Sequence, residues 1–141
     1  MQTREVSGDR EFFCTLEHGA TVHEELAAFA AAEDVETGWF WGTGAVQDAT
    51  LATDDQDEFA TERVDYAEPL GMPALAGWLA RDEAGDPTVV ATAVLARPSG
   101  QALAGRLDRA TVFDAEVYVH TFAETIARTP DAATDRETWT V

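Results

Sequence analysis

The sequence predicts an α+β fold, in which a mostly antiparallel sheet of about seven strands packs against one main helix. Three observations predict this class. A single amphipathic helical pattern occurs near the start, the rest of the chain is dominated by apolar and β-branched segments, and most connections between them are short turns. A βαβ repeat would need a helix between successive strands, so a parallel sheet is excluded.

The helix is expected from about Thr21 to Asp34. Thr21 lies three residues before Glu24, which is the spacing of a capping box. Apolar residues then follow at the i, i+4, i+7 and i+8 positions that form one helix face, namely Val22, Leu26, Phe29 and Ala30. This pattern predicts a helix that covers the sheet with one side.

The central strand is expected in the apolar and aromatic stretch from Thr37 to Asp48, continuing to residue 53. Glycine weakens a strand interior unless the backbone bends or approaches another chain segment closely. We therefore interpret Gly42 and Gly44 as positions where this strand packs against another backbone, and Gly77 and Gly105 as structural glycines on later strands. The other strands are expected at residues 10–16, 59–66, 70–81, 88–96, 101–107 and 111–120.

The chain of 141 residues is expected to form a single domain, residues 1–141, with a core at about residues 10–120 and a polar tail at 121–141. We expect the tail to fold over the body through Ile126 and Trp139. No apolar run approaches the roughly 20 residues of a membrane span, and the start lacks the apolar region of an export signal. These features predict a cytoplasmic protein.

Charge is the strongest compositional feature, because 27 acidic residues face nine basic residues, all of them arginine, for a net charge of −18. Such an acidic chain repels itself at low ionic strength and loses most of that penalty in molar salt. The composition resembles that of salt-in halophilic archaea; an acidic mesophilic protein is the alternative. Direct DNA binding is disfavoured, since nucleic-acid affinity rests on basic residues that neutralise phosphates and no basic tail or Arg-Gly-Arg hook is present.

No motif of a known catalytic class occurs in the chain. A nucleophile elbow and a dinucleotide fingerprint are both missing, and the Gly42–Gly44 segment lacks the helix start and lysine of a phosphate loop. The acidic run Asp54–Glu58 is interpreted as a solvated hairpin turn, with a cation site as the alternative.

The remaining candidates for chemistry are three histidines and one cysteine. His18 and His23 are not spaced as ligands on one helix face, and His120 lies at a strand end; surface or capping roles are favoured over metal binding. Cys14 lies in an apolar strand with no cation nearby in sequence, which indicates a buried inert thiol rather than a nucleophile. It also excludes an intramolecular disulfide.

Four segments together resemble the plants-and-prokaryotes conserved (PPC) domain, a domain of unknown function. They are the opening turn and helix, the glycine-rich strand with Gly-Thr-Gly-Ala, the acidic region that ends in Gly77, and the closing hairpins, at Glu17–Asp34, Gly38–Asp48, Glu68–Gly77 and Asp86–Val119. The resemblance implies a homotrimer with strands packed across subunit boundaries. It also implies a link to DNA, because plant relatives that carry AT-hooks bind it.

The chain departs from the family at the metal site. Members of the family commonly carry three histidines, which resemble a metal site in several prokaryotic members, and the resemblance places Val90, Thr92 and Arg106 at those positions. Valine offers no lone pair, threonine is a poor zinc ligand, and arginine is a fixed cation, so no metal cofactor is expected. We hypothesise that the Arg106 guanidinium replaces the ion, pairing with Glu116 or binding an anionic ligand; an ordinary exposed arginine is the alternative.

Three classes of function remain open. The first is a homotrimeric binding or regulatory module without catalytic activity, with a ligand site at Val90, Thr92, Arg106 and Glu116. The second is a DNA-associated protein, which rests on fold-level analogy alone. The third is an enzyme that uses a pocket between subunits.

Overall fold

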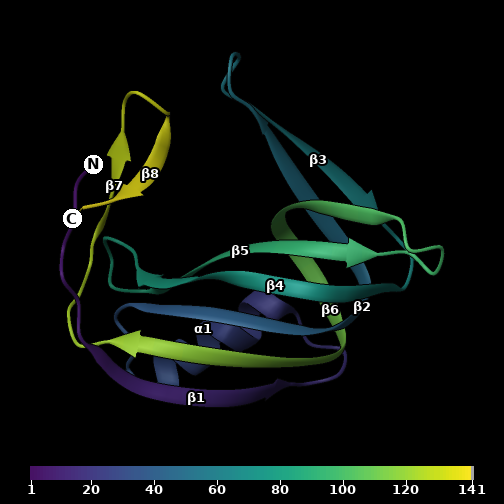
Figure 1. The fold of residues 1–141 in the computed structure, drawn as a ribbon, viewed down its shortest axis with the longest axis horizontal. Helices are drawn as coiled ribbons and strands as arrows, with labels where there is room; N and C mark the ends of the chain where they lie inside the picture. Colours follow the sequence, from purple (N-terminus) through teal and green to yellow (C-terminus); the bar gives the residue numbers. More distant parts are fainter. Residues whose placement is uncertain (141) are drawn as a thin grey trace.

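In the computed structural model, which describes residues 1–140, the chain forms a six-stranded sheet, a two-stranded sheet and one helix (Figure 1). The main sheet contains β1 (Gly8–Leu16), β2 (Gly38–Asp55), β3 (Ala60–Tyr66), β4 (Leu70–Arg81), β5 (Pro87–Ala96) and β6 (Ala102–Phe122). The second sheet pairs β7 (Arg128–Asp131) with β8 (Arg136–Trp139). Every strand pairing is antiparallel, which confirms the predicted α+β class.

The main sheet curls on itself because two of its strands are unusually long. β2 has 18 residues and β6 has 21, whereas most strands have roughly 3–10. β2 pairs with β4, β4 with β5, β5 with β6, and β6 pairs back along β2, so these four strands close a ring. Register shifts along the β2–β6 ladder bend both strands enough for this closure.

Helix α1 (Val22–Ala32) covers the inner face of the sheet. Thr21 is the N-cap residue, as expected, but its hydroxyl bonds the Glu24 carboxylate instead of a backbone N–H. The helix stops at Ala32 because Asp34 adopts a left-handed backbone conformation (φ 53°). No membrane-spanning helix occurs within residues 1–140.

The core lies between α1 and the sheet. Alternation along the strands sends every second side chain inward, so Phe40, Val117 and Val119 are fully buried. Leu26 of the helix packs into the same cluster as Leu75 of β4. The alternate side chains of these strands point to the opposite, outer face.

Two strand predictions differ from the structure. The segments expected as separate strands at 101–107 and 111–120 form the single strand β6, because the residues between them keep pairing with β2: Thr50 lies opposite Arg109 and Ala49 opposite Ala110. The charged turn expected to begin at Asp54 begins later, since Asp54 and Asp55 still belong to β2. Asp55 instead stabilises the turn by accepting the backbone N–H groups of Asp57 and Glu58.

The segment expected as a polar tail begins inside β6 and ends in the β7–β8 hairpin. Ile126 is buried and donates its backbone N–H to Thr37 Oγ1 at 3.0 Å. Trp139 packs on Trp78 of β4 with ring centroids 5.1 Å apart. Both residues that the sequence singled out in the tail therefore contact the body, and the β7–β8 hairpin projects on the same side of the molecule as the β2–β3 hairpin (Figure 1).

Candidate functional site

The pairing of β5 with β6 brings together three of the four residues predicted to bind a ligand. Thr92 lies directly opposite Arg106, and Val90 lies two residues before Thr92 on the same face of β5. All three line a groove of about 1130 Å³ between the outer face of the sheet and the β7–β8 hairpin. Alanine residues and Gly105 give this groove a flat floor.

Glu116 does not join this group. It lies opposite Thr43 on β2 and Thr15 on β1, whereas Arg106 lies opposite Ala52. Arg106 and Glu116 belong to the same strand, and ten residues of strand span roughly 30 Å. The hypothesised pair between Arg106 and Glu116 is therefore not formed within the chain, since β6 runs on without a turn between the two residues.

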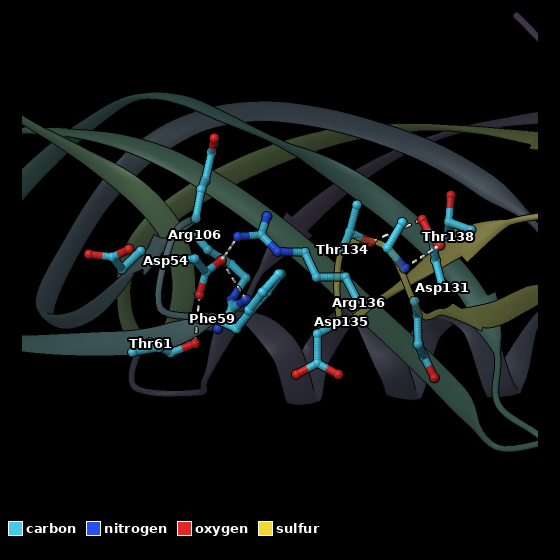
Figure 2. Close-up of a pocket in the computed structure, with 14 residues that line it drawn as sticks. Asp54, Phe59, Thr61, Arg106, Asp131, Thr134, Asp135, Arg136 and Thr138 are labelled. Atoms are coloured by element: carbon cyan, nitrogen blue, oxygen red, sulfur yellow. Dashed lines mark hydrogen bonds and ion pairs between the residues drawn. The ribbon is translucent and has the colours of Figure 1, made fainter.

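Arg106 pairs with Asp54 of β2 instead. Its Nη1 donates to Asp54 Oδ2 at 3.2 Å, and Arg136 of β8 places Nη2 2.9 Å from the same oxygen. Thr61 of β3 donates its hydroxyl to the other carboxylate oxygen at 2.6 Å. Figure 2 shows the three side chains converging on Asp54, whose side chain is only 16% exposed.

This arrangement favours an ionised carboxylate. The hydrogen bond from Thr61 lowers the pKa of Asp54, partial burial opposes that shift, and the charges of Arg106, Arg136 and Arg63 lower the pKa further. Asp54 thus remains a carboxylate at neutral pH and ties the β7–β8 hairpin to β2 and β6.

No local signal in the sequence marked this contact. Asp54 and Arg136 are far apart in the chain, and each lies in a polar stretch typical of a solvent-exposed turn. Only the long β2–β6 ladder and the position of the tail hairpin bring them together.

The residues that the sequence resemblance places at a metal site do not fit a metal ion. Arg106 is a fixed cation already paired with Asp54, Val90 has no donor atom, and the Thr92 hydroxyl donates to the Ala76 carbonyl at 3.3 Å. Within residues 1–140, no three His, Cys, Asp or Glu side chains gather as a metal site would require. No step of chemistry is assigned to a metal here.

The three histidines lie in separate places. His18 bonds the Phe113 carbonyl (2.7 Å), and His120 lies 3.4 Å from the Glu11 carboxylate. Burial lowers the pKa of His23 and outweighs the opposing charge of Asp108. Burial also raises the pKa of the Cys14 thiol, as the charge of Glu33 does, so the thiol stays protonated at neutral pH.

The predicted structural glycines lie where strands approach one another closely. A Cβ on Gly42 or Gly44 would clash with a carbonyl oxygen of β6, that of Glu116 or Asp114. On Gly77 it would clash with the carbonyl oxygen of Val90, and on Gly105 it would lie 3.0 Å from the Ala52 carbonyl oxygen. Gly105 thereby also keeps the groove floor next to Arg106 flat.

A second feature of the outer face is a row of aromatic side chains. Strand register places Phe13 of β1 beside Tyr118 of β6, and Tyr118 beside Trp41 of β2. Phe13 is 74% exposed and Trp41 is 48% exposed, and the Trp41 and Tyr118 rings are 4.6 Å apart. The Trp39–Trp78 pair lies next to this row, with ring centroids 4.5 Å apart.

Most of the chain matches a known protein family. Residues 3–123 match the Plants and Prokaryotes Conserved (PCC) domain. A comparison with curated protein sequences finds no match. The β7–β8 hairpin lies outside the matched residues.

Three solved structures share the fold at low sequence identity. A metal-containing protein from Archaeoglobus fulgidus is 23% identical, with a TM-score of 0.92 and 100% of both chains covered. A plant- and prokaryote-conserved (PPC) protein from Pyrococcus horikoshii is 21% identical, with a TM-score of 0.91 over 100% of this chain and 98% of that chain. A "putative DNA-binding protein" from Ralstonia eutropha is 23% identical, with a TM-score of 0.84 over 92% and 90%.

Proposed function

Because the chain belongs to the Plants and Prokaryotes Conserved domain family, we propose that it is a homotrimeric binding or regulatory module without catalytic activity. The aromatic row Phe13–Tyr118–Trp41 is the observation that supports assembly into a trimer. The observation that carries the binding role is the groove at Val90, Thr92 and Arg106.

The aromatic row supports self-assembly on physical grounds. Two large side chains of the row are substantially exposed, and the Trp39–Trp78 pair lies beside the row on the same sheet face. Contiguous exposed apolar surface of this kind is typical of protein interfaces, where aromatic residues are enriched. Burying it against other copies of the chain would also add stability to a small domain.

The groove supports binding rather than chemistry. Arg106 pairs with Asp54, and the Thr92 hydroxyl donates to the Ala76 backbone carbonyl. A general base or nucleophile would need a partner that activates it, and the groove residues named here form no such pair. A metal bound in stoichiometric amount to the purified protein would favour the enzyme alternative instead.

We expect a trimer in molar KCl, and we expect Trp41→Arg to dissociate it. The substitution places a charge at one end of the aromatic row, next to Tyr118, where removing an aromatic anchor at an interface hot spot costs at least about 2 kcal/mol of binding. Sedimentation equilibrium should give three times the 15.2 kDa chain mass for the wild type and one chain mass for the variant.

Phe113→Arg is the matched control, because Phe113 is 56% exposed but stacks on His18, away from the row. It should leave the mass unchanged. A wild type that sediments as a monomer at every concentration would refute the assembly, and loss of the trimer in both variants would refute the role of the row.

DNA association is the second candidate, since the structural neighbour from Ralstonia eutropha is described as a "putative DNA-binding protein". Against it stand the net charge of −18 and the pairing of most arginines with carboxylates. We expect no retardation of short duplex DNA at physiological salt in a gel-shift assay. Retardation that weakens steeply as KCl rises would instead support this candidate.

A further inference from the structure

Arg106 and Arg136 differ from the other paired arginines of this acidic chain. Arg63, Arg97 and Arg128 each face a carboxylate of their own, and Arg10 and Arg81 each face two. Arg106 and Arg136 share the single carboxylate of Asp54. Two guanidinium groups therefore converge on one carboxylate at this place.

Four other acidic residues line the cavity beside the two guanidinium groups, and three of them, all except Asp135, have hydrogen-bond or ion-pair partners of their own. Asp55 accepts two backbone N–H groups of the β2–β3 turn, and Asp131 accepts the Ala133 N–H and the Thr134 hydroxyl. Glu137 lies 3.4 Å from Arg128. These carboxylates stabilise their own turns and pairs, and Asp54 alone neutralises Arg106 and Arg136 within salt-bridge distance among residues 1–140.

Both guanidinium groups keep donors for a further partner. Each carries five N–H donors, and the contact with Asp54 occupies one nitrogen of each. They line a cavity of about 600 Å³ between the β2–β3 and β7–β8 hairpins, together with the hydroxyl-bearing Thr61 and Thr138 (Figure 2). Partial exposure of both side chains, 36% for Arg106 and 51% for Arg136, makes the donors accessible from this cavity.

The cavity continues into the flat-floored groove. Asp54, Arg106 and Arg136 line both spaces, so a molecule bound to the guanidinium groups could extend over Ala104 and Gly105. A guanidinium fork matches the oxygen spacing of carboxylate and phosphate groups. The site therefore combines an anion-binding mouth with a small-residue floor.

We propose that Arg106 and Arg136 form a binding site for a small molecule that carries a carboxylate or phosphate group. Asp54 is the internal carboxylate that holds the two side chains in place when the ligand is absent. The inference specifies the ligand class of the proposed binding role and rests on that role, but it does not require the trimer. A monomer that binds phosphate would refute the assembly and leave this site standing.

The test is calorimetric titration of the full chain with inorganic phosphate and, separately, with succinate, at constant ionic strength in KCl. We expect saturable binding of at least one probe with one site per chain, and preference between the two distinguishes phosphate-bearing from carboxylate-bearing ligands. Arg106→Gln and Arg136→Gln should each weaken binding about tenfold or more, because each removes a charged donor. Asp54→Asn should strengthen binding severalfold, because it removes the competing negative charge.

Arg109→Gln is the matched control. Arg109 lies on the same strand as Arg106 but lines neither cavity, so its removal should leave the affinity unchanged. Arg106→Lys and Arg136→Lys, which keep the charge but lose the fork, replace any glutamine variant that fails to fold, and should still bind more weakly than the wild type. The proposal is overturned if neither probe binds, if Arg109→Gln weakens binding as much as Arg106→Gln, or if Asp54→Asn does not strengthen it.

Discussion

Replacing Gly77 by alanine is expected to destabilise the fold by about 3 kcal/mol or more, the upper range for overpacking a close-packed interior. The new Cβ would clash with the Val90 carbonyl oxygen and lie 2.5 Å from Phe40 Cζ and 3.0 Å from Ala91 Cα. Phe40 is fully buried and Val90 belongs to the neighbouring strand, so neither can move without disturbing the core or the β4–β5 ladder. Chemical denaturation in molar KCl measures the change.

Gly71→Ala provides the control on the same strand, β4. A Cβ there would meet the Ala96 carbonyl oxygen at 3.7 Å, which is an ordinary contact. Alanine is usually better than glycine in a strand interior by roughly 0.5–1 kcal/mol, so this variant should be as stable as the wild type or slightly more stable. Equal effects of the two substitutions would show that close strand approach at Gly77 does not limit stability.

Raising KCl from about 0.1 M to about 2 M is expected to raise the melting temperature by about 10 °C or more. The net charge of −18 makes the folded chain repel itself, and the Debye length falls from about 10 Å at 0.1 M to about 3 Å at 1 M. Added salt weakens short-range ion pairs such as Arg106–Asp54 less than it weakens this repulsion, because the pairs are partly buried. Thermal unfolding followed by circular dichroism, at fixed protein concentration, measures the shift.

The control separates charge screening from a general salting-out effect. Glu58, Glu62 and Glu83 are exposed, and no ion pair to them occurs in the described residues. Neutralising all three to glutamine should make the melting temperature less dependent on KCl. A melting temperature that is flat across this range, or an unchanged salt dependence in the neutralised variant, would contradict the halophilic interpretation.

The candidate site shows how one misplaced strand boundary changes a functional prediction. The sequence predicts two strands at residues 101–107 and 111–120, with a break between them. In the structure β6 stays paired with β2 through this stretch. Glu116 therefore lies in the opposite half of β6 from Arg106. The partner of Arg106 is then Asp54, a residue that local charge had placed in a solvated turn.

The sequence by itself determined the features that depend on neighbouring residues. Apolar periodicity located α1, alternation located the strands of the sheet, and the order of short motifs identified the family that matches residues 3–123. Val90, Thr92 and Arg106, which the family resemblance grouped as one site, lie on the paired strands β5 and β6 and line one groove.

Only the tertiary structure decided which distant residues meet. The long β2–β6 ladder sets how far Arg106 lies from Glu116 and how close it lies to Asp54, and the tail hairpin adds Arg136 from the other end of the chain. Salt bridges between separate polar segments produce no periodic pattern in the sequence. A charged residue in a solvated turn and one in an ion pair have the same kinds of neighbours along the chain. Their partners are chosen by strand register and by the folding back of the chain, which depend on the whole fold.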